Sequence, residues 1–136
     1  MNLPAKFCIS SEDDIRLAVR VYIPRPMWIE PALGSTNGLP DFFWFPSVGR
    51  LVFGECKMVA GGLVHFTPAQ QRVFPRMVAD GAEIGLVLGV RGTGQVFWAD
   101  LGVLDGWSRL RPGWAGKSVP LGGMNSVGVK AEQNRM

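Results

Sequence analysis

Two carboxylates in the middle of the chain could share one divalent cation, and a lysine lies close to them in the sequence. Asp41 stands at the start of one apolar run, and Glu55 and Lys57 lie two residues apart in the next. Carboxylate oxygens are the hard ligands that Mg²⁺ and Mn²⁺ prefer. Because unpaired charges are costly to bury, these groups need one another, a metal or a water-filled cleft. The alternative, a buried ion pair that only fills space, stays open on spacing alone.

Two predicted strands place these charges on one face of a hairpin. Residues 41–45 and 51–59 are rich in aromatic and apolar residues, and Pro, Ser and Gly between them indicate a turn. If Phe45 pairs with Leu51, Asp41 lies opposite Glu55, with Cβ atoms about 4.5–5.5 Å apart. A bulge at either glycine of the hairpin would shift this register.

The alternation of side chains along a strand divides the second run between two faces. Lys57 falls on the face of Glu55, whereas Cys56 points the other way. Both faces are largely apolar, which predicts a strand pair covered on both sides.

A helix is expected directly after the hairpin. Thr67 suits its N-cap, Pro68 its first position, and Gln70 falls where it completes a capping box. The helix should end near Asp80, with Gly81 as its C-cap. Capping is therefore a structural role for Gln70, to be weighed beside any role at a site formed with Asp41, Glu55 and Lys57. The expected inner stripe is Val73, Met77 and Val78, with a kink at Pro75.

The order of these motifs resembles the PD-(D/E)xK nuclease superfamily, and within it the VRR-NUC and Holliday-junction-resolvase-like branch. The resemblance covers roughly residues 35–90. It rests on Gly-x-Pro-Asp at 38–41, Glu-x-Lys at 55–57 and Thr-x-x-Gln at 67–70, followed by a helix, Gly81 and the apolar strand 84–90.

The resemblance implies a catalytic site and its chemistry. Asp41 and Glu55 would bind Mg²⁺ or Mn²⁺ with the backbone carbonyl of Cys56, Lys57 would act at the attacking water, and Gln70 would lie at the edge. Such a metal lowers the pKa of bound water and polarises a phosphoryl oxygen. The function implied is metal-dependent endonuclease cleavage of DNA, selective for branched or flapped structures and performed by a homodimer.

Further charged residues are weaker candidates for the same site. The family often carries a glutamate on its first helix, for which Glu12 is the nearest candidate. Arg72 and Arg76, four residues apart on the second helix, could contact DNA phosphates or form a solvated face. His65, the only histidine, could reach a phosphate, although an exposed loop position is the favoured interpretation.

The expected fold is α/β, with a restriction-endonuclease-like core. A mixed sheet of four or five strands would be flanked by helices over 12–22 and 68–80. Start signals favour a helix for the first, whereas the alternation of residues 15–23 favours a strand. Residues 1–114 would form one domain and 115–136 a flexible tail. Trp107 and Trp114 alternate with basic residues, and packing onto the core is favoured over binding of single strands.

Composition restricts the remaining choices. The 136 residues carry a net charge of +3, which permits a polyanionic partner without requiring one. The absence of a long apolar run argues against a membrane, and two isolated cysteines favour a reducing cytoplasm, that of the host if a phage encodes the protein. The rival functions are a catalytically inactive DNA-binding module and a phage-type protein inhibitor of a host enzyme.

Overall fold

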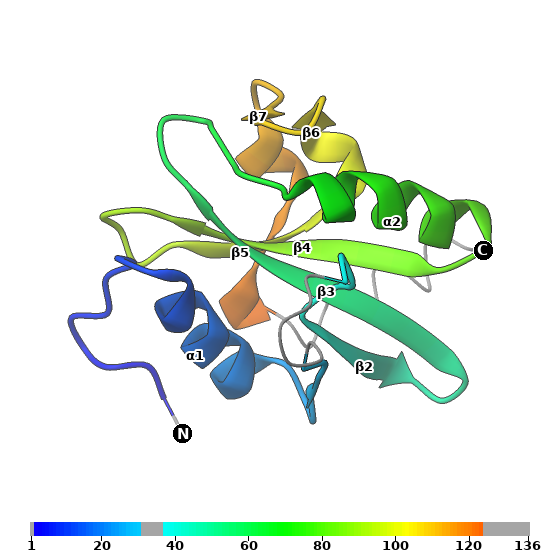
Figure 1. Cartoon of the computed structure of the whole chain (residues 1–136). Helices are drawn as coiled ribbons and strands as arrows, with labels where there is room; N and C mark the ends of the chain where they lie inside the picture. The colour runs from blue at the N-terminus through cyan, green and yellow to red at the C-terminus, as the bar shows by residue number, and fades with distance from the viewer. Residues whose placement is uncertain (1, 31–36, 124–136) are drawn as a thin grey trace.

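A mixed β-sheet with one long helix on each face forms the body of the molecule (Figure 1). The computed structural model describes residues 2–30 and 37–123. Within these residues the sheet has six strands in the order β1-β2-β3-β4-β5-β8, and β6 and β7 form a separate pair. The elements are α1 (Glu12–Tyr22), β1 (Met27–Trp28), β2 (Phe42–Ser47), β3 (Arg50–Val59), α2 (Pro68–Ala79), β4 (Glu83–Val90), β5 (Val96–Asp100), η1 (Leu101–Val103), β6 (Leu104–Asp105), β7 (Arg109–Leu110), η2 (Trp114–Lys117), β8 (Val119–Pro120) and η3 (Leu121–Gly123).

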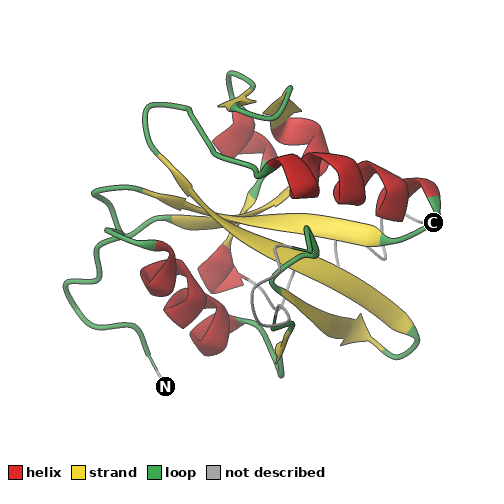
Figure 2. Ribbon diagram, in the orientation of Figure 1, coloured by secondary structure: helices red, strands yellow, loops and turns green. Residues whose placement is uncertain are grey.

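The parallel pairing of β3 with β4 fixes the position of α2. All other neighbouring strands run antiparallel, so α2 is the crossover between two parallel strands. The helices lie on opposite sides of the sheet (Figure 2). Each covers one of two buried clusters, so the sheet lies between the cluster beneath α1 and the cluster beneath α2. The predicted α/β class is confirmed, with six strands in the sheet where four or five were expected.

The first helix has the bounds that its start signals predict. Ser11 is the N-cap of α1, three acids occupy the first turn, and the helix ends before Pro24. Ile15, Ala18 and Val19 are buried on one stripe, which a strand could not have presented to the sheet together. The helical interpretation of 12–22 is therefore confirmed over the strand.

The second helix presents a face that overlaps only in part with the predicted one. Its buried residues are Gln70 and Phe74, whereas Val78 is 46% exposed. Of the predicted inner stripe, Met77 packs against the cluster beneath α2 and Val73 is half-buried, whereas the prediction for Val78 is wrong. The helix continues through Pro75, and Gly81 follows it with a φ of +97°.

The region expected to be a flexible tail contributes to the sheet and the core. Strand β8 pairs with β5, and Leu121 beside it is 1% exposed in the cluster beneath α1. Residues 115–123 therefore differ from that prediction, and 124–136 lie outside the described residues. Trp107 and Trp114 pack against the other cluster, as favoured, while Arg109 and Arg111 stay exposed.

The two cysteines lie in different environments. Cys8 is exposed and Cys56 is buried, and both are free thiols. No helix in residues 2–30 and 37–123 is long and apolar enough to cross a membrane.

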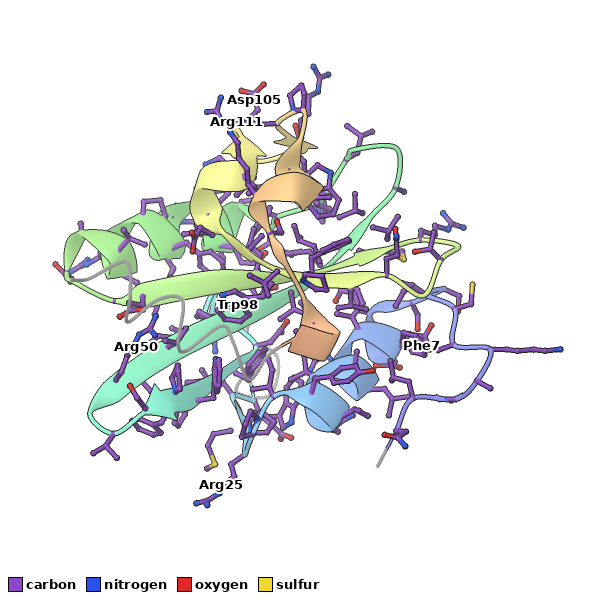
Figure 3. All side chains as sticks on the ribbon, turned by 180° about the vertical axis from the view of Figure 1, so that it is seen from behind. Phe7, Arg25, Arg50, Trp98, Asp105 and Arg111 are labelled. Atoms are coloured by element: carbon purple, nitrogen blue, oxygen red, sulfur yellow. The ribbon has the colours of Figure 1, made fainter. Side chains whose placement is uncertain are left out.

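Two paired glycines make room for large rings on the α1 side of the sheet. Gly54 of β3 is the register partner of Gly85 of β4. A Cβ atom at Gly54 would lie 2.3 Å from Phe42 Cζ, and one at Gly85 would lie 2.1 Å from Trp98 Cζ2. Trp98 stands on the sheet in the view from behind (Figure 3). These rings fill the space that side chains would otherwise take, so the strands bearing the charged residues are fixed by packing beneath them.

Substitution of Gly54 by alanine should therefore destabilise the protein. Overpacking against the Phe42 ring is expected to lower the free energy of unfolding by about 1–3 kcal/mol, measured by urea denaturation. Gly102→Ala is the control, because a Cβ atom there meets open space. Equal stability of the two variants would contradict the packing argument.

Candidate functional site

The hairpin brings Asp41 beside Glu55 in the predicted register. Phe42 pairs with Gly54 and Phe43 with Phe53, and the Asp41 amide donates to the Gly54 carbonyl at 3.0 Å. Asp41 is thus one step beyond the last pair, on the side of Glu55.

The register fails at the other end of the hairpin. It shifts between Trp44 and Ser47, and Ser47 pairs with Arg50, so the predicted Phe45–Leu51 pair does not close the turn. Pro46 lies within the shift and has no amide hydrogen to donate to the ladder. The irregularity is therefore at Pro46, away from the charged residues.

Glu55, Lys57 and Gln70 form one buried network. They are 3%, 5% and 8% exposed, respectively. Gln70 Nε2 donates to Glu55 Oε2 at 2.8 Å, and Lys57 Nζ donates to Gln70 Oε1 at 2.9 Å. Lys57 Nζ lies 3.4 Å from Glu55 Oε2, and 4.6 Å from the centre of the Phe66 ring. The lysine charge is thus shared among an amide, a carboxylate and an aromatic face.

Gln70 both caps its helix and connects Glu55 with Lys57 by hydrogen bonds. Its Oε1 accepts the Thr67 amide hydrogen at 3.1 Å, while Thr67 Oγ1 accepts the Gln70 amide hydrogen at 3.1 Å. The capping box turns Oε1 toward the Thr67 amide and Lys57, which leaves Nε2 for Glu55. The structural and functional interpretations of Gln70 are therefore compatible.

Asp41 is held by a cation and a backbone amide. Arg16 Nη2 lies 2.9 Å from Asp41 Oδ1, and the Cys56 amide donates to Asp41 Oδ2 at 2.8 Å. The Cys56 side chain lies on the opposite face in the cluster beneath α1, where burial raises the pKa of its thiol. The Cys56 backbone therefore borders the site while its thiol does not. Arg16 was not found from the sequence, although it lies one helical turn after Glu12.

A cavity of about 370 Å³ contains the predicted catalytic residues together with Glu12. Partial desolvation raises the pKa of Glu12, with Lys57 opposing and Asp41 reinforcing the shift, although the residue is exposed as a whole. The residues that line the cavity are Glu12, Asp41, Glu55, Lys57, Met58, His65, Thr67 and Gln70. His65 is an exposed residue, as favoured, but it stands at this cavity. Arg72 and Arg76 are exposed on α2 and do not line it.

The Glu55 carboxylate lacks a full set of partners. Its Oε1 atom is buried and accepts no hydrogen bond. Burial, and then the neighbouring Asp41, raises its pKa from 4.5 to about 8, against the opposing effects of Lys57 and Gln70. A buried oxygen of this kind fits a cation ligand. In the described residues, however, no three acidic, histidine or cysteine side chains are gathered so that they could hold a metal ion.

The raised pKa predicts a stability that falls with rising pH in EDTA. The folded protein retains a proton on Glu55 that the unfolded chain releases between pH 4.5 and about 8. The free energy of unfolding should therefore fall across this window, by at most about 1.4 kcal/mol per pH unit from this group. Glu55→Gln should flatten the slope in urea denaturation, and Asp105→Asn, at the periphery in Figure 3, should leave it unchanged. An unchanged slope in Glu55→Gln would contradict the shift.

Comparison with known proteins adds no assignment to this geometry. No protein-family model matches the chain, and no curated protein matches it.

Proposed function

We propose that this protein is a divalent-metal-dependent endonuclease that hydrolyses DNA phosphodiester bonds. The observation that carries the proposal is the buried, unpartnered Oε1 of Glu55, which stands in one cavity with Asp41 and Lys57. An ionised carboxylate is costly to leave in this state, so Glu55 holds a proton up to about pH 8 unless a metal cation takes the proton's place. The short motifs that resemble those of PD-(D/E)xK nucleases contain the same three residues, Asp41, Glu55 and Lys57.

Each residue has a separate role in this proposal. Asp41 and Glu55 would hold Mg²⁺ or Mn²⁺, with the Cys56 carbonyl beside them and Glu12 as an additional acid. The metal supplies a water of lowered pKa and polarises the phosphoryl oxygen. Lys57 orients that water or offsets the charge that develops on the phosphate. Gln70 fixes Glu55 and Lys57 relative to each other through its two hydrogen bonds.

The ion pair between Arg16 and Asp41 would have to open before Asp41 could bind a metal through the paired oxygen. The Arg16 guanidinium occupies Asp41 Oδ1, so Asp41 is satisfied by the protein's own cation. This contact favours the second candidate, a DNA-binding module without catalysis, in which the ion pair is permanent. Under the nuclease proposal, metal competes with Arg16 for that oxygen.

Selectivity for branched or flapped DNA and cleavage by a homodimer belong to the same proposal. Phe45, whose ring contacts that of Phe43, is 58% exposed, and Leu51 is 39% exposed. Both give the hairpin apolar surface on which association of two copies can be tested.

Nicking of supercoiled plasmid DNA tests the catalytic roles. Wild-type protein should nick with Mg²⁺ or Mn²⁺ and not with EDTA. Asp41→Ala, Glu55→Ala and Lys57→Ala should each lose at least about 100-fold in rate, because each removes charge stabilisation at the phosphate or the metal. Asp105→Asn, an exposed acid of β6, is the matched control. Full nicking activity in all three alanine variants would contradict the proposal.

Metal binding can be measured without catalysis. Mn²⁺ at about 100 times its Kd should raise the free energy of unfolding by about 2.7 kcal/mol. Asp41→Asn and Glu55→Gln should abolish this increase, since each removes a negative ligand, while Asp105→Asn should retain it. A wild-type protein that gains no stability from either metal would exclude a cation at these carboxylates and favour the binding module.

A further inference from the structure

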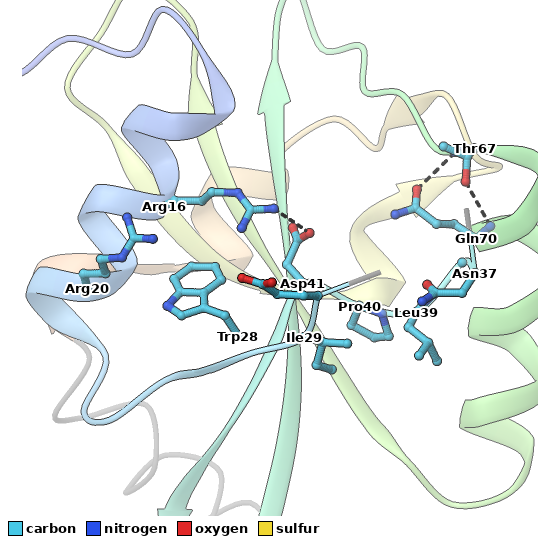
Figure 4. Close-up of a pocket in the computed structure, with 12 residues that line it drawn as sticks. Arg16, Arg20, Trp28, Ile29, Asn37, Leu39, Pro40, Asp41, Thr67 and Gln70 are labelled. Carbon is cyan, nitrogen blue, oxygen red and sulfur yellow. Dashed lines mark hydrogen bonds and ion pairs between the residues drawn. The ribbon is translucent and has the colours of Figure 1, made fainter. Parts of the chain in front are cut away.

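A second, larger cavity opens beside the acidic one. It has a volume of about 610 Å³ and shares Asp41, Thr67 and Gln70 with the cavity that contains Glu55. One of its sides is formed by Arg16 and Arg20 of α1 and by Trp28 of β1 (Figure 4). Basic side chains therefore stand directly next to the acidic residues of the proposed nuclease site.

Trp28 holds the two arginines in place. The guanidinium carbon of Arg16 lies 5.0 Å from the centre of the Trp28 ring, and that of Arg20 lies 4.9 Å from it. Trp28 in turn packs on the buried Phe42, with ring centres 5.2 Å apart. Arg16 and Arg20 lie four residues apart on the same side of α1. The indole thus fixes two like charges near each other through cation–π contacts.

The two guanidinium groups differ in what neutralises them. Arg16 is paired with Asp41, whereas Arg20 forms no ion pair with any residue in 2–30 and 37–123. Glu30 also lines the cavity and is exposed. With Asp41 at the acidic end and Glu30 on the lining, the Arg20 end is the part of the cavity that an anion would enter.

We propose that Arg20 and Arg16 form a subsite for a backbone phosphate of the DNA strand, next to the phosphodiester presented to Asp41 and Glu55. This inference rests on the proposed function, because it assigns the strand's direction of approach to that site. Arginine binds phosphate through paired N–H donors in a fixed fork. Trp28 is a positioning residue: its ring is covered by the two guanidinium groups, so it orients them and does not stack on a base.

The subsite can be tested by DNA binding in EDTA, where no cleavage occurs. Fluorescence anisotropy of a fluorescein-labelled DNA oligonucleotide is measured at several salt concentrations. Arg20→Ala should weaken binding about fivefold or more and reduce the slope of log K against log salt by about one, as loss of one phosphate contact does. Trp28→Leu should weaken binding while the slope changes less, because both charges remain. Arg20→Lys should restore part of the affinity.

Arg91→Ala is the matched control, an exposed arginine in the turn between β4 and β5. Its affinity and salt slope should stay close to wild type, and circular dichroism establishes that each variant is folded. Equal losses in Arg20→Ala and Arg91→Ala, no loss in either, or no DNA binding by the wild type would overturn the subsite.

Failure of the subsite and failure of the nuclease proposal give different results. If the wild type never nicks DNA but Arg20→Ala specifically loses affinity, the subsite stands and the protein is a binding module. If the wild type nicks and Arg20→Ala nicks with unchanged KM, the nuclease proposal stands and the subsite is wrong.

Discussion

The neighbouring side chains are arranged around the buried carboxyl group of Glu55, which needs polar partners inside the protein. Glu55 lies on the α2 face of β3, within a sheet whose other residues on that face are largely apolar. The parallel β3–β4 pair requires a crossover, and that crossover places the first turn of α2 over Glu55. Gln70, which the helix needs for its capping box, is thereby brought to both Glu55 and Lys57. One side chain links the topology of the sheet, the start of the helix and the electrostatics of the cavity.

The arrangement around Glu55 argues against an ion pair that only fills space. In a self-sufficient buried pair, excellent geometry and further hydrogen bonds must satisfy both partners. Here the lysine stands 3.4 Å from Glu55 Oε2 and closer to the Gln70 amide, and Glu55 Oε1 has no partner. Asp41 adds negative charge, which raises the pKa of Glu55 further. Glu55 therefore stays incompletely satisfied where the two carboxylates meet, and under the proposed function a divalent cation would complete it.

Sequence patterns predicted the features that depend on residues close together in the chain, namely the strand register near Asp41 and the bounds of α1. The register of residues 42–44 with 52–54 follows from the alternation of side chains, and the bounds of α1 follow from its caps and acids. The prediction for α2 was wrong at Val78, which is exposed, because its most apolar stripe was assumed to face inward throughout. With Gln70 turned to the site, Phe74 one turn later is the residue that becomes buried. The bonds of Arg16 and Trp28 could not be read from the sequence, since they depend on how α1 lies across β1 and the entrance of β2.

Arg16 connects the two cavities and gives the two proposals a common consequence. Its guanidinium lies over the Trp28 ring of the larger cavity and pairs with Asp41, which lines both cavities. Under the two proposals, Asp41 would hold the metal once it is released from Arg16, and Arg16 would then be available to the phosphate beside Arg20. Coupling of this kind is reciprocal: whatever factor the metal contributes to DNA affinity, DNA contributes to metal affinity. If both proposals hold, the Arg16–Asp41 ion pair forms in the absence of both ligands, and the binding of metal and of DNA each favours its opening.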